Sequence, residues 1–178
     1  MSKVLMNSRS IKTSLILLSL CFSIVVPAAV AQSATPKTVK DYFLAVPEEY
    51  LGFSKAEREA LLKGPGIIVD IKNGYLSYNA SDNPEEFELT LLKQTDGTYI
   101  VAISIDADPD FDSKSILHLL KYAEGQWSDV TNEVLTVPFN DRYIYALPRI
   151  GTTIKVTTMK GKKLYDLVWV NNKFKIRK

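Results

Sequence analysis

The chain has 178 residues, of which 46% are hydrophobic and 24% charged, and its formal net charge is +2. One histidine and one cysteine argue against a zinc site or a histidine-based nucleophilic triad, because zinc sites need several nitrogen or sulfur ligands and such triads need a histidine base. His118 lies on an alternating stretch with Ile116 and Leu120, which favours a half-buried strand residue over a catalytic base. The length is enough for one domain that buries about two-thirds of its surface on folding.

The first 31 residues are arranged as in a secretory signal peptide. Lys3, Arg9 and Lys12 come before an apolar run at residues 14–26, and an Ala-Val-Ala sequence at residues 29–31 supplies the small side chains of a cleavage site. The run is shorter than the roughly 20 residues that cross a bilayer, although an uncleaved membrane anchor is the alternative interpretation. We predict cleavage after residue 31 and export to the periplasm or the extracellular space.

Cleavage would also remove the single cysteine, Cys21, so the exported chain would contain no disulfide and would depend on its core for stability. Residues 32–37 are small and polar, and we expect them to form a flexible leader. No later segment is long and apolar enough to span a membrane as a helix. We therefore expect one folded domain after the leader, with no transmembrane segment.

The charges are unevenly distributed along the chain. Residues 41–141 contain 7 basic and 19 acidic side chains, a net charge of −12, whereas residues 149–178 contain 9 basic and 1 acidic, a net charge of +8. The two regions can neutralise each other within one fold, or the basic region can meet phosphates, anionic lipid or acidic glycans. Basic and aromatic residues are not interleaved as in nucleic-acid-binding modules, so we expect no nucleic-acid partner.

Two short helices are predicted at the start of the domain. Residues 38–45 have an apolar stripe with helical spacing. Ser54 and Glu57 have the spacing of a capping box, in which each side chain accepts an amide proton of the other residue, and they predict a helix at residues 55–63. Such short helices need a surface to pack on, so we expect residues 38–66 to form a helical cap on the domain.

From residue 67 onward apolar and polar side chains alternate, as in strands with two different faces. The Asn73-Gly74 dipeptide predicts a hairpin with a two-residue turn, in which Ile71 pairs with Leu76.

A second hairpin follows, and its two strands must bring their apolar sets to the same face. A two-residue turn would separate the two sets. A three-residue loop with Gly97 in the left-handed conformation pairs Phe87 with Ile105 and Leu89 with Ile103, and we predict this register.

Further strands are predicted at residues 116–122, 127–131, 143–147, 152–158, 164–170 and 174–176. Short turns join most of them, so strands adjacent in sequence can pair antiparallel. The stretch 164–170 is apolar on both faces except for Asp166, which predicts more than one covering layer. The fold class is mainly β: an antiparallel meander of about ten strands over residues 67–178, barrel-like or sandwiched, after two short N-terminal helices.

Four aromatic residues are candidate ligand contacts. Tyr143 and Tyr145 share one strand face, and Tyr165 and Trp169 share another. Flat rings on a sheet can stack on sugars or other flat ligands, but they are also ordinary core side chains. Both interpretations stay open at this point.

Asp106, Asp108, Asp110 and Asp112 place carboxylates at alternate positions, as calcium-binding loops do. The pattern departs from the helix–loop–helix calcium motif, because Phe111 occupies the glycine position. The alternative is a solvated acidic loop that keeps a strand edge from pairing. Calcium is therefore a candidate ligand of this loop, and the sequence indicates no other cofactor.

Residues 41–51 read Asp-Tyr-Phe-Leu-Ala-Val-Pro-Glu-Glu-Tyr-Leu, and strands with a Gly-Gln-Trp turn follow. This stretch resembles small exported bacterial proteins of no assigned activity. The resemblance implies export and a single small domain, and it carries no catalytic residues.

The sequence shows no nucleophile–base set, phosphate-binding loop or metal-ligand cluster. The leading hypothesis is an exported, non-enzymatic binding or envelope-associated module that works through a sheet face or an exposed edge, with an envelope protein or a glycan as its partner. One alternative is a hydrolase that uses carboxylates such as Asp108 or Asp110 on glycans or peptides. The other is a purely structural envelope protein.

Overall fold

The computed structural model describes residues 35–79, 86–106 and 114–178. The described residues all belong to one compact unit, Gln32–Lys178. The predicted signal peptide and the first residues of the leader lie outside the described residues.

Short helices precede and interrupt the strands. They are α1 (Val39–Ala45), the 3₁₀ turn η1 (Glu48–Tyr50), α2 (Lys55–Leu61) and α3 (Thr131–Val134). Capping boxes begin α1, at Thr38 and Asp41, and α2, at Ser54 and Glu57, so both predicted helices are confirmed. The longest described helices have seven residues, and none of those described has the length and hydrophobicity needed to cross a membrane.

Ten strands in the described part of the chain form two antiparallel sheets. The first sheet consists of β1 (Ile67–Asp70), β2 (Tyr75–Tyr78), β3 (Phe87–Lys93), β4 (Tyr99–Ile105), β5 (Ile116–Ala123) and β6 (Gln126–Asp129), paired in that order. The second sheet has the order β10-β9-β8-β7, with β7 (Tyr143–Ala146), β8 (Thr153–Thr158), β9 (Lys163–Val170) and β10 (Lys173–Arg177). Among these strands neither sheet closes on itself, so the barrel considered from the sequence is wrong, and the chain forms two consecutive meanders.

The β3–β4 hairpin has the predicted register, in which Phe87 pairs with Ile105 and Leu89 with Ile103. Gly97 in its loop has a φ of 86°, the left-handed conformation that this loop requires and that glycine adopts without strain.

The predicted register of the β1–β2 hairpin is wrong, because Leu76 pairs with Val69 rather than with Ile71. The carboxylate of Asp70 accepts hydrogen bonds from the backbone N of Asn73 at 3.2 Å and from its side-chain amide at 2.9 Å. These bonds stabilise a four-residue loop in place of the two-residue turn. A shift of two residues keeps every side chain on its face, so Leu76 still points into the core.

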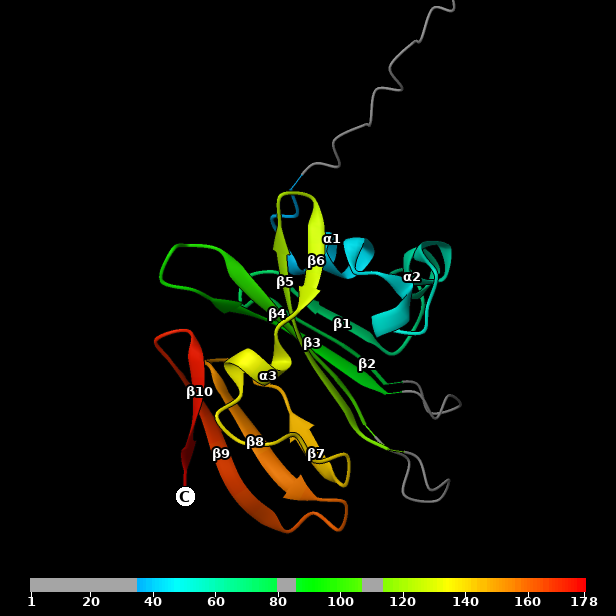
Figure 1. The fold of residues 1–178 in the computed structure, drawn as a ribbon. Coiled ribbons are helices and arrows are strands. Elements are labelled where there is room, and N and C mark those ends of the chain that lie inside the picture. Colours follow the sequence, from blue (N-terminus) through cyan, green and yellow to red (C-terminus); the bar gives the residue numbers. More distant parts are fainter. Residues whose placement is uncertain (1–34, 80–85, 107–113) are drawn as a thin grey trace, which may run out of the picture. The chain divides into compact units, whose positions relative to one another are not determined.

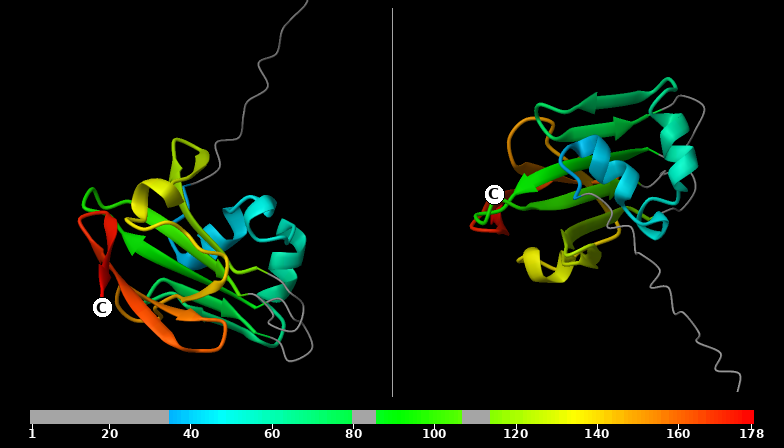
Figure 2. Two further views of the ribbon diagram at one scale, coloured as in Figure 1. Left: turned by 60° about the horizontal axis from the view of Figure 1, so that its bottom comes forward. Right: turned by 90° about the horizontal axis from the view of Figure 1, so that it is seen from above.

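The first sheet is covered on both faces, as Figures 1 and 2 show. In Figure 1, α1 and α2 lie above the first sheet and the second sheet lies below it. The helical side is packed through Val39 and Phe43 of α1 against Leu89, Val101 and other strand residues. The other side is a second cluster, shared by the two sheets, that contains Leu92, Ile100, Leu119, Tyr145, Ile154, Leu167 and Phe174.

Burial on both faces belongs to β4, not to the predicted stretch in β9. Ile100 and Ala102 of β4 face the second sheet, and Val101 and Ile103 face the helices. In β9, Leu167 is buried between the sheets, whereas Val170, on the other face, is 38% exposed. The described residues therefore cover only the inner face of the second sheet.

Candidate functional site

The outer face of the second sheet carries all five basic residues of its strands. Side chains alternate along a strand, and Tyr145, Ile154, Leu167 and Phe174 all point inward. Their neighbours point outward, and this outer surface, called here the basic face, carries Lys155, Lys163, Asp166, Lys173, Lys175 and Arg177. Five cations and one carboxylate give the basic face a net charge of +4.

The strand register places these charges in a regular array. Asp166 pairs with Lys155 on one side and with Arg177 on the other, and Lys175 pairs with Val168. Alternate residues of a strand are about 7 Å apart and neighbouring strands about 5 Å apart. Neighbouring cations of this array are therefore held on rigid strands roughly one Debye length apart at physiological salt, and an approaching anion meets several of them together.

Asp166 lies beneath the cations, with 8% of its surface exposed. Lys163 Nζ is 3.1 Å and Arg177 Nη2 is 3.3 Å from its carboxylate oxygens. The hydrogen bond from Lys163, opposed by burial and assisted by Arg177, holds the pKa of Asp166 below its ordinary value. Asp166 thus anchors two of the five cations. Within the described residues Lys173 and Lys175 form no ion pair.

The acidic region of the chain does little to neutralise the basic one. Among the described ion pairs, one joins residues 149–178 to residues 41–141, between Arg149 Nε and Asp70 Oδ2 at 2.9 Å. The remaining described pairs of the basic region are internal and involve Asp166.

The four aromatic candidates are all associated with the core between the sheets. Tyr145 is 1% exposed, and its hydroxyl accepts a hydrogen bond from Asn140 N at 3.0 Å. Tyr143, Tyr165 and Trp169 are partly buried against the same core cluster, and Trp169 Nε1 donates to the carbonyl of Lys93 at 3.0 Å. The register places their strand face opposite the basic face, and a ligand-binding role for them stays a prediction.

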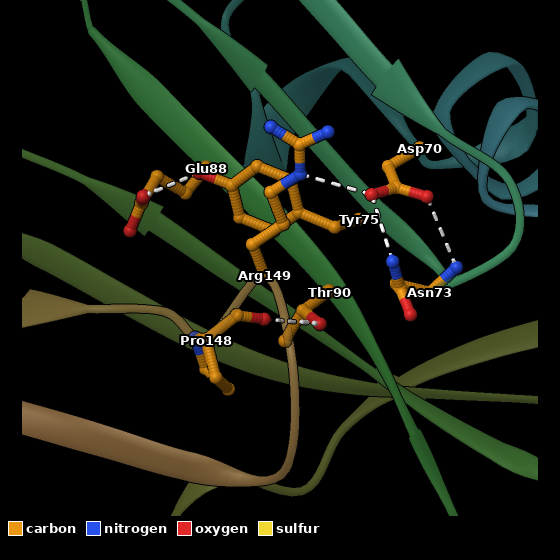
Figure 3. A network of polar contacts seen from close by, with 7 residues as sticks. All are labelled: Asp70, Asn73, Tyr75, Glu88, Thr90, Pro148 and Arg149. Atoms are coloured by element: carbon orange, nitrogen blue, oxygen red, sulfur yellow. Dashed lines mark hydrogen bonds and ion pairs between the residues drawn. The ribbon is translucent and has the colours of Figure 1, made fainter.

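A polar network connects the β7–β8 connector, residues 147–149, to the first sheet (Figure 3). Leu147 N donates to Glu88 Oε2 at 2.5 Å, and the hydroxyl of Tyr75 donates to Glu88 Oε1 at 2.6 Å. Next along the connector, Thr90 Oγ1 donates to the carbonyl of Pro148 at 3.3 Å, and Arg149 pairs with a carboxylate of β1. Tyr75 and Glu88 of this network also line a pocket.

The pocket lies beside β2 and the start of β3, and its volume is about 380 Å³. It is lined by the carboxylates Glu86, Glu88 and Asp106, by the polar residues Tyr75, Ser77 and Asn79, and by Ile68, Tyr78 and Phe87. Burial, reinforced by the charges of Glu88 and then Glu86, raises the pKa of Asp106 to about 6. Asp106 is therefore a carboxyl group that can be protonated at mildly acidic pH.

Replacing Asp106 by asparagine should stabilise the folded protein at pH 7 by about 1–2 kcal/mol. The pKa rise from 3.8 to about 6 corresponds to at most about 3 kcal/mol, and partial exposure to solvent screens some of it. Because the pKa is higher in the folded than in the unfolded chain, the carboxyl's contribution to stability is complete below about pH 4 and is lost as the pH rises through about 6. Urea unfolding of both proteins across this range measures the difference, and a difference independent of pH would contradict the argument.

Of the four predicted metal ligands, Asp106 lies in this pocket, and Asp108, Asp110 and Asp112 lie outside the described residues. Within residues 35–79, 86–106 and 114–178, no group of three His, Cys, Asp or Glu residues is placed to hold a metal ion. Calcium binding by the acidic loop stays a prediction.

His118 is a partly exposed strand residue on the helical side of the first sheet. Its Nδ1 lies 2.9 Å from Asp129 Oδ2, and the ring of Tyr50 meets it edge-on with the centroids 5.0 Å apart. Although burial raises it, hydrogen bonds from Thr131 and His118 hold the pKa of Asp129 below its ordinary value. The ion pair joins β5 to β6, and the contact between the rings of Tyr50 and His118 connects η1 to this hairpin.

The juxtaposition of Glu86 with Asp106 was missed from the sequence, although the signal was present. The predicted pairing of Phe87 with Ile105 implies that the residues just outside that pair, Glu86 and Asp106, also lie opposite each other. The structure shows this pairing, with Asp106 N donating to the carbonyl of Glu86 at 3.2 Å.

No protein-family model and no curated protein matches the chain. A solved structure, of a domain of an uncharacterized protein from Porphyromonas gingivalis W83, matches with a TM-score of 0.55 at 13% sequence identity. The match covers 78% of this chain and 97% of that one. At this identity the similarity shows a shared fold.

Proposed function

We propose that the protein is an exported, non-enzymatic binding module that associates with the cell envelope through the basic face. The observation that carries the proposal is the outward array of Lys155, Lys163, Lys173, Lys175 and Arg177 around one carboxylate on rigid strands. The sequence features of export and the uneven charge of the chain support it as well.

A binding role suits this surface for two physical reasons. A surface of one sign attracts partners of the opposite sign and accelerates their association. Strands keep the charges in place before the partner arrives, so less conformational entropy is lost on binding than with a flexible basic tail. Such an association should weaken as salt is added.

Reversing the charge of Lys173 and Lys175 should release the protein from the envelope. In the Lys173→Glu/Lys175→Glu variant, binding to isolated envelopes should fall by at least about tenfold, because two charges change sign and the net charge of the basic face falls by four units. Co-sedimentation of the exported chain with washed envelopes at increasing salt measures this.

The matched control is Lys63→Glu/Lys72→Glu, which makes the same change of net charge at two exposed lysines outside the second sheet. It should bind as the wild type does. Equal losses in both variants would show that only net charge matters. Full binding of the Lys173→Glu/Lys175→Glu variant would remove the role of the basic face and favour a purely structural envelope protein.

A carboxylate-based hydrolase acting on glycans or peptides is the second candidate, favoured by the raised pKa of Asp106 in a pocket that also holds Glu86. A carboxyl group with a pKa near the working pH can donate a proton to a leaving group, while a second, ionised carboxylate assists the attack on the substrate. The Asp106→Asn variant tests this too: any hydrolysis of envelope glycans or peptides by the wild type should be lost. A wild-type protein that releases no products would exclude this candidate.

A further inference from the structure

We infer that the partner of the basic face is a lipid bilayer surface that carries anionic headgroups. This inference rests on the proposed function, because it names the partner of the same surface. Three features of the second sheet support it: exposed aliphatic side chains among the cations, the inward orientation of its aromatic rings, and the kind of cation present.

The first feature is aliphatic surface between the charges. Val168 and Val170 lie on the basic face because they pair with Lys175 and Lys173, and Val170 is 38% exposed. Side chains of this kind gain from entering the boundary between headgroups and acyl chains, while neighbouring lysines extend their ammonium groups to the phosphates.

The exposed aliphatic surface also explains why β9 is apolar on both of its faces. A strand that is apolar on both faces predicts two covering layers, yet within the described residues only the inner face of the second sheet is covered. A bilayer would supply the second layer. The valines would then contact lipid at the same time as Lys173 and Lys175 neutralise headgroup charge.

The second feature argues against a sugar as the partner. Glycan-binding sites use the flat faces of aromatic rings, but the rings of the second sheet pack on its inner side, where Tyr145, Tyr165 and Trp169 belong to or contact the core between the sheets. The residues assigned above to the basic face include no aromatic ring. The face therefore lacks the stacking surface that a sugar ring needs.

The third feature is that four of the five cations are lysines. A lysine ammonium is a compact point charge on a flexible stem, whereas arginine has the planar fork that binds one carboxylate or phosphate in a fixed geometry. The single arginine, Arg177, is already paired with Asp166. Free lysines such as Lys173 and Lys175 suit many mobile headgroups better than one rigidly placed anion.

Vesicle binding of the exported chain tests the inference. Wild type should sediment with vesicles of phosphatidylcholine mixed with phosphatidylglycerol, and should not sediment with vesicles of phosphatidylcholine alone. Each lysine near such a surface contributes about a fivefold gain in binding. Lys173→Glu/Lys175→Glu should therefore lose at least about 25-fold, whereas Lys63→Glu/Lys72→Glu should bind as the wild type does.

Val170→Ser separates a bilayer from a soluble polyanion. This variant keeps every charge of the basic face, so its binding to an acidic polysaccharide should be unchanged, whereas its binding to the anionic vesicles should weaken severalfold because the lipid contact is lost. Circular dichroism of each variant shows whether it has kept its fold. Binding of the wild type to the anionic vesicles should also weaken as salt is added, and this measurement requires no variant.

Several outcomes would overturn the inference. Equal binding to neutral and anionic vesicles would exclude attraction by anionic headgroups. Binding to the polysaccharide with none to anionic vesicles would assign the basic face to a glycan. If wild type fails to bind vesicles but sediments with envelopes and is released by Lys173→Glu/Lys175→Glu, the lipid inference fails and the proposed function stands. If it binds neither vesicles nor envelopes, both fail.

Discussion

Replacing Phe174 by alanine should lower the free energy of unfolding by about 3–5 kcal/mol, the usual range for removing a fully buried aromatic side chain. Phe174 has no exposed surface and lies in the cluster shared by the two sheets. Its ring meets the ring of Trp169 edge-on with the centroids 5.0 Å apart, and its backbone forms a parallel bridge with Leu135 after α3. The variant therefore loses burial, an aromatic contact and support for the segment that joins the sheets.

The control for this variant lies two residues away on the same strand. Ile176 is 41% exposed, so Ile176→Ala should destabilise the protein by less than about 1 kcal/mol. Urea unfolding followed by tryptophan fluorescence and by circular dichroism measures both variants. If the two losses were equal, Phe174 would not have the central packing role described here.

Much of the strand pattern is predictable because it follows from local physics. The β3–β4 register could be chosen because only one loop length puts Phe87, Leu89, Ile103 and Ile105 on the same face, and the helical cap was signalled by a capping box. The β1–β2 register was wrong because the carboxylate of Asp70 stabilises a longer loop. The Asn-Gly dipeptide by itself predicts a two-residue turn, and that prediction takes no account of the hydrogen bonds from Asn73 to Asp70.

The division into two sheets was harder to predict, because it depends on contacts between residues far apart in sequence. Every hairpin from β1 to β6 and from β7 to β10 forms between neighbours in the chain, and a period of two does not show where the pairing stops. The break occurs at residues 130–142, which contain α3. There Leu119 N, in β5, donates a hydrogen bond to the side-chain oxygen of Thr131 at 2.8 Å. This side-chain bond stands where a continuing strand would supply a backbone carbonyl, so the pairing with β5 ends.

The basic face and the network around Glu88 also differ in how far the sequence predicts them. The basic face follows from strand alternation once the inner side of the second sheet is known, and the charge asymmetry was visible in the sequence. The contacts between the β7–β8 connector and the first sheet join residues 58 to 79 positions apart, and no local pattern encodes such contacts. Glu88 is one of several acidic residues in its segment, and within the described residues it is the one that accepts hydrogen bonds from both Tyr75 and Leu147.

Replacing Glu88 by alanine should lower the free energy of unfolding by about 2–3 kcal/mol. The variant leaves the hydroxyl of Tyr75 (Figure 3) and the N–H of Leu147 without their acceptor, and hydrogen bonds to a charged partner each contribute about 1.5–3 kcal/mol. Relief of the repulsion between Glu88 and Asp106 offsets part of the loss. Urea unfolding at pH 7 measures the net effect.

Glu86→Ala is the matched control, because Glu86 is an exposed carboxylate that lines the same pocket and also raises the pKa of Asp106. Both variants should lower the pKa of Asp106, since each removes a neighbouring negative charge. Only Glu88→Ala should lower stability, and only it should lower the pKa of Tyr75, which burial and the hydrogen bond to Glu88 raise to about 12. If Glu86→Ala destabilised the fold as much, the contribution of Glu88 would come from its charge and not from its position between the two sheets.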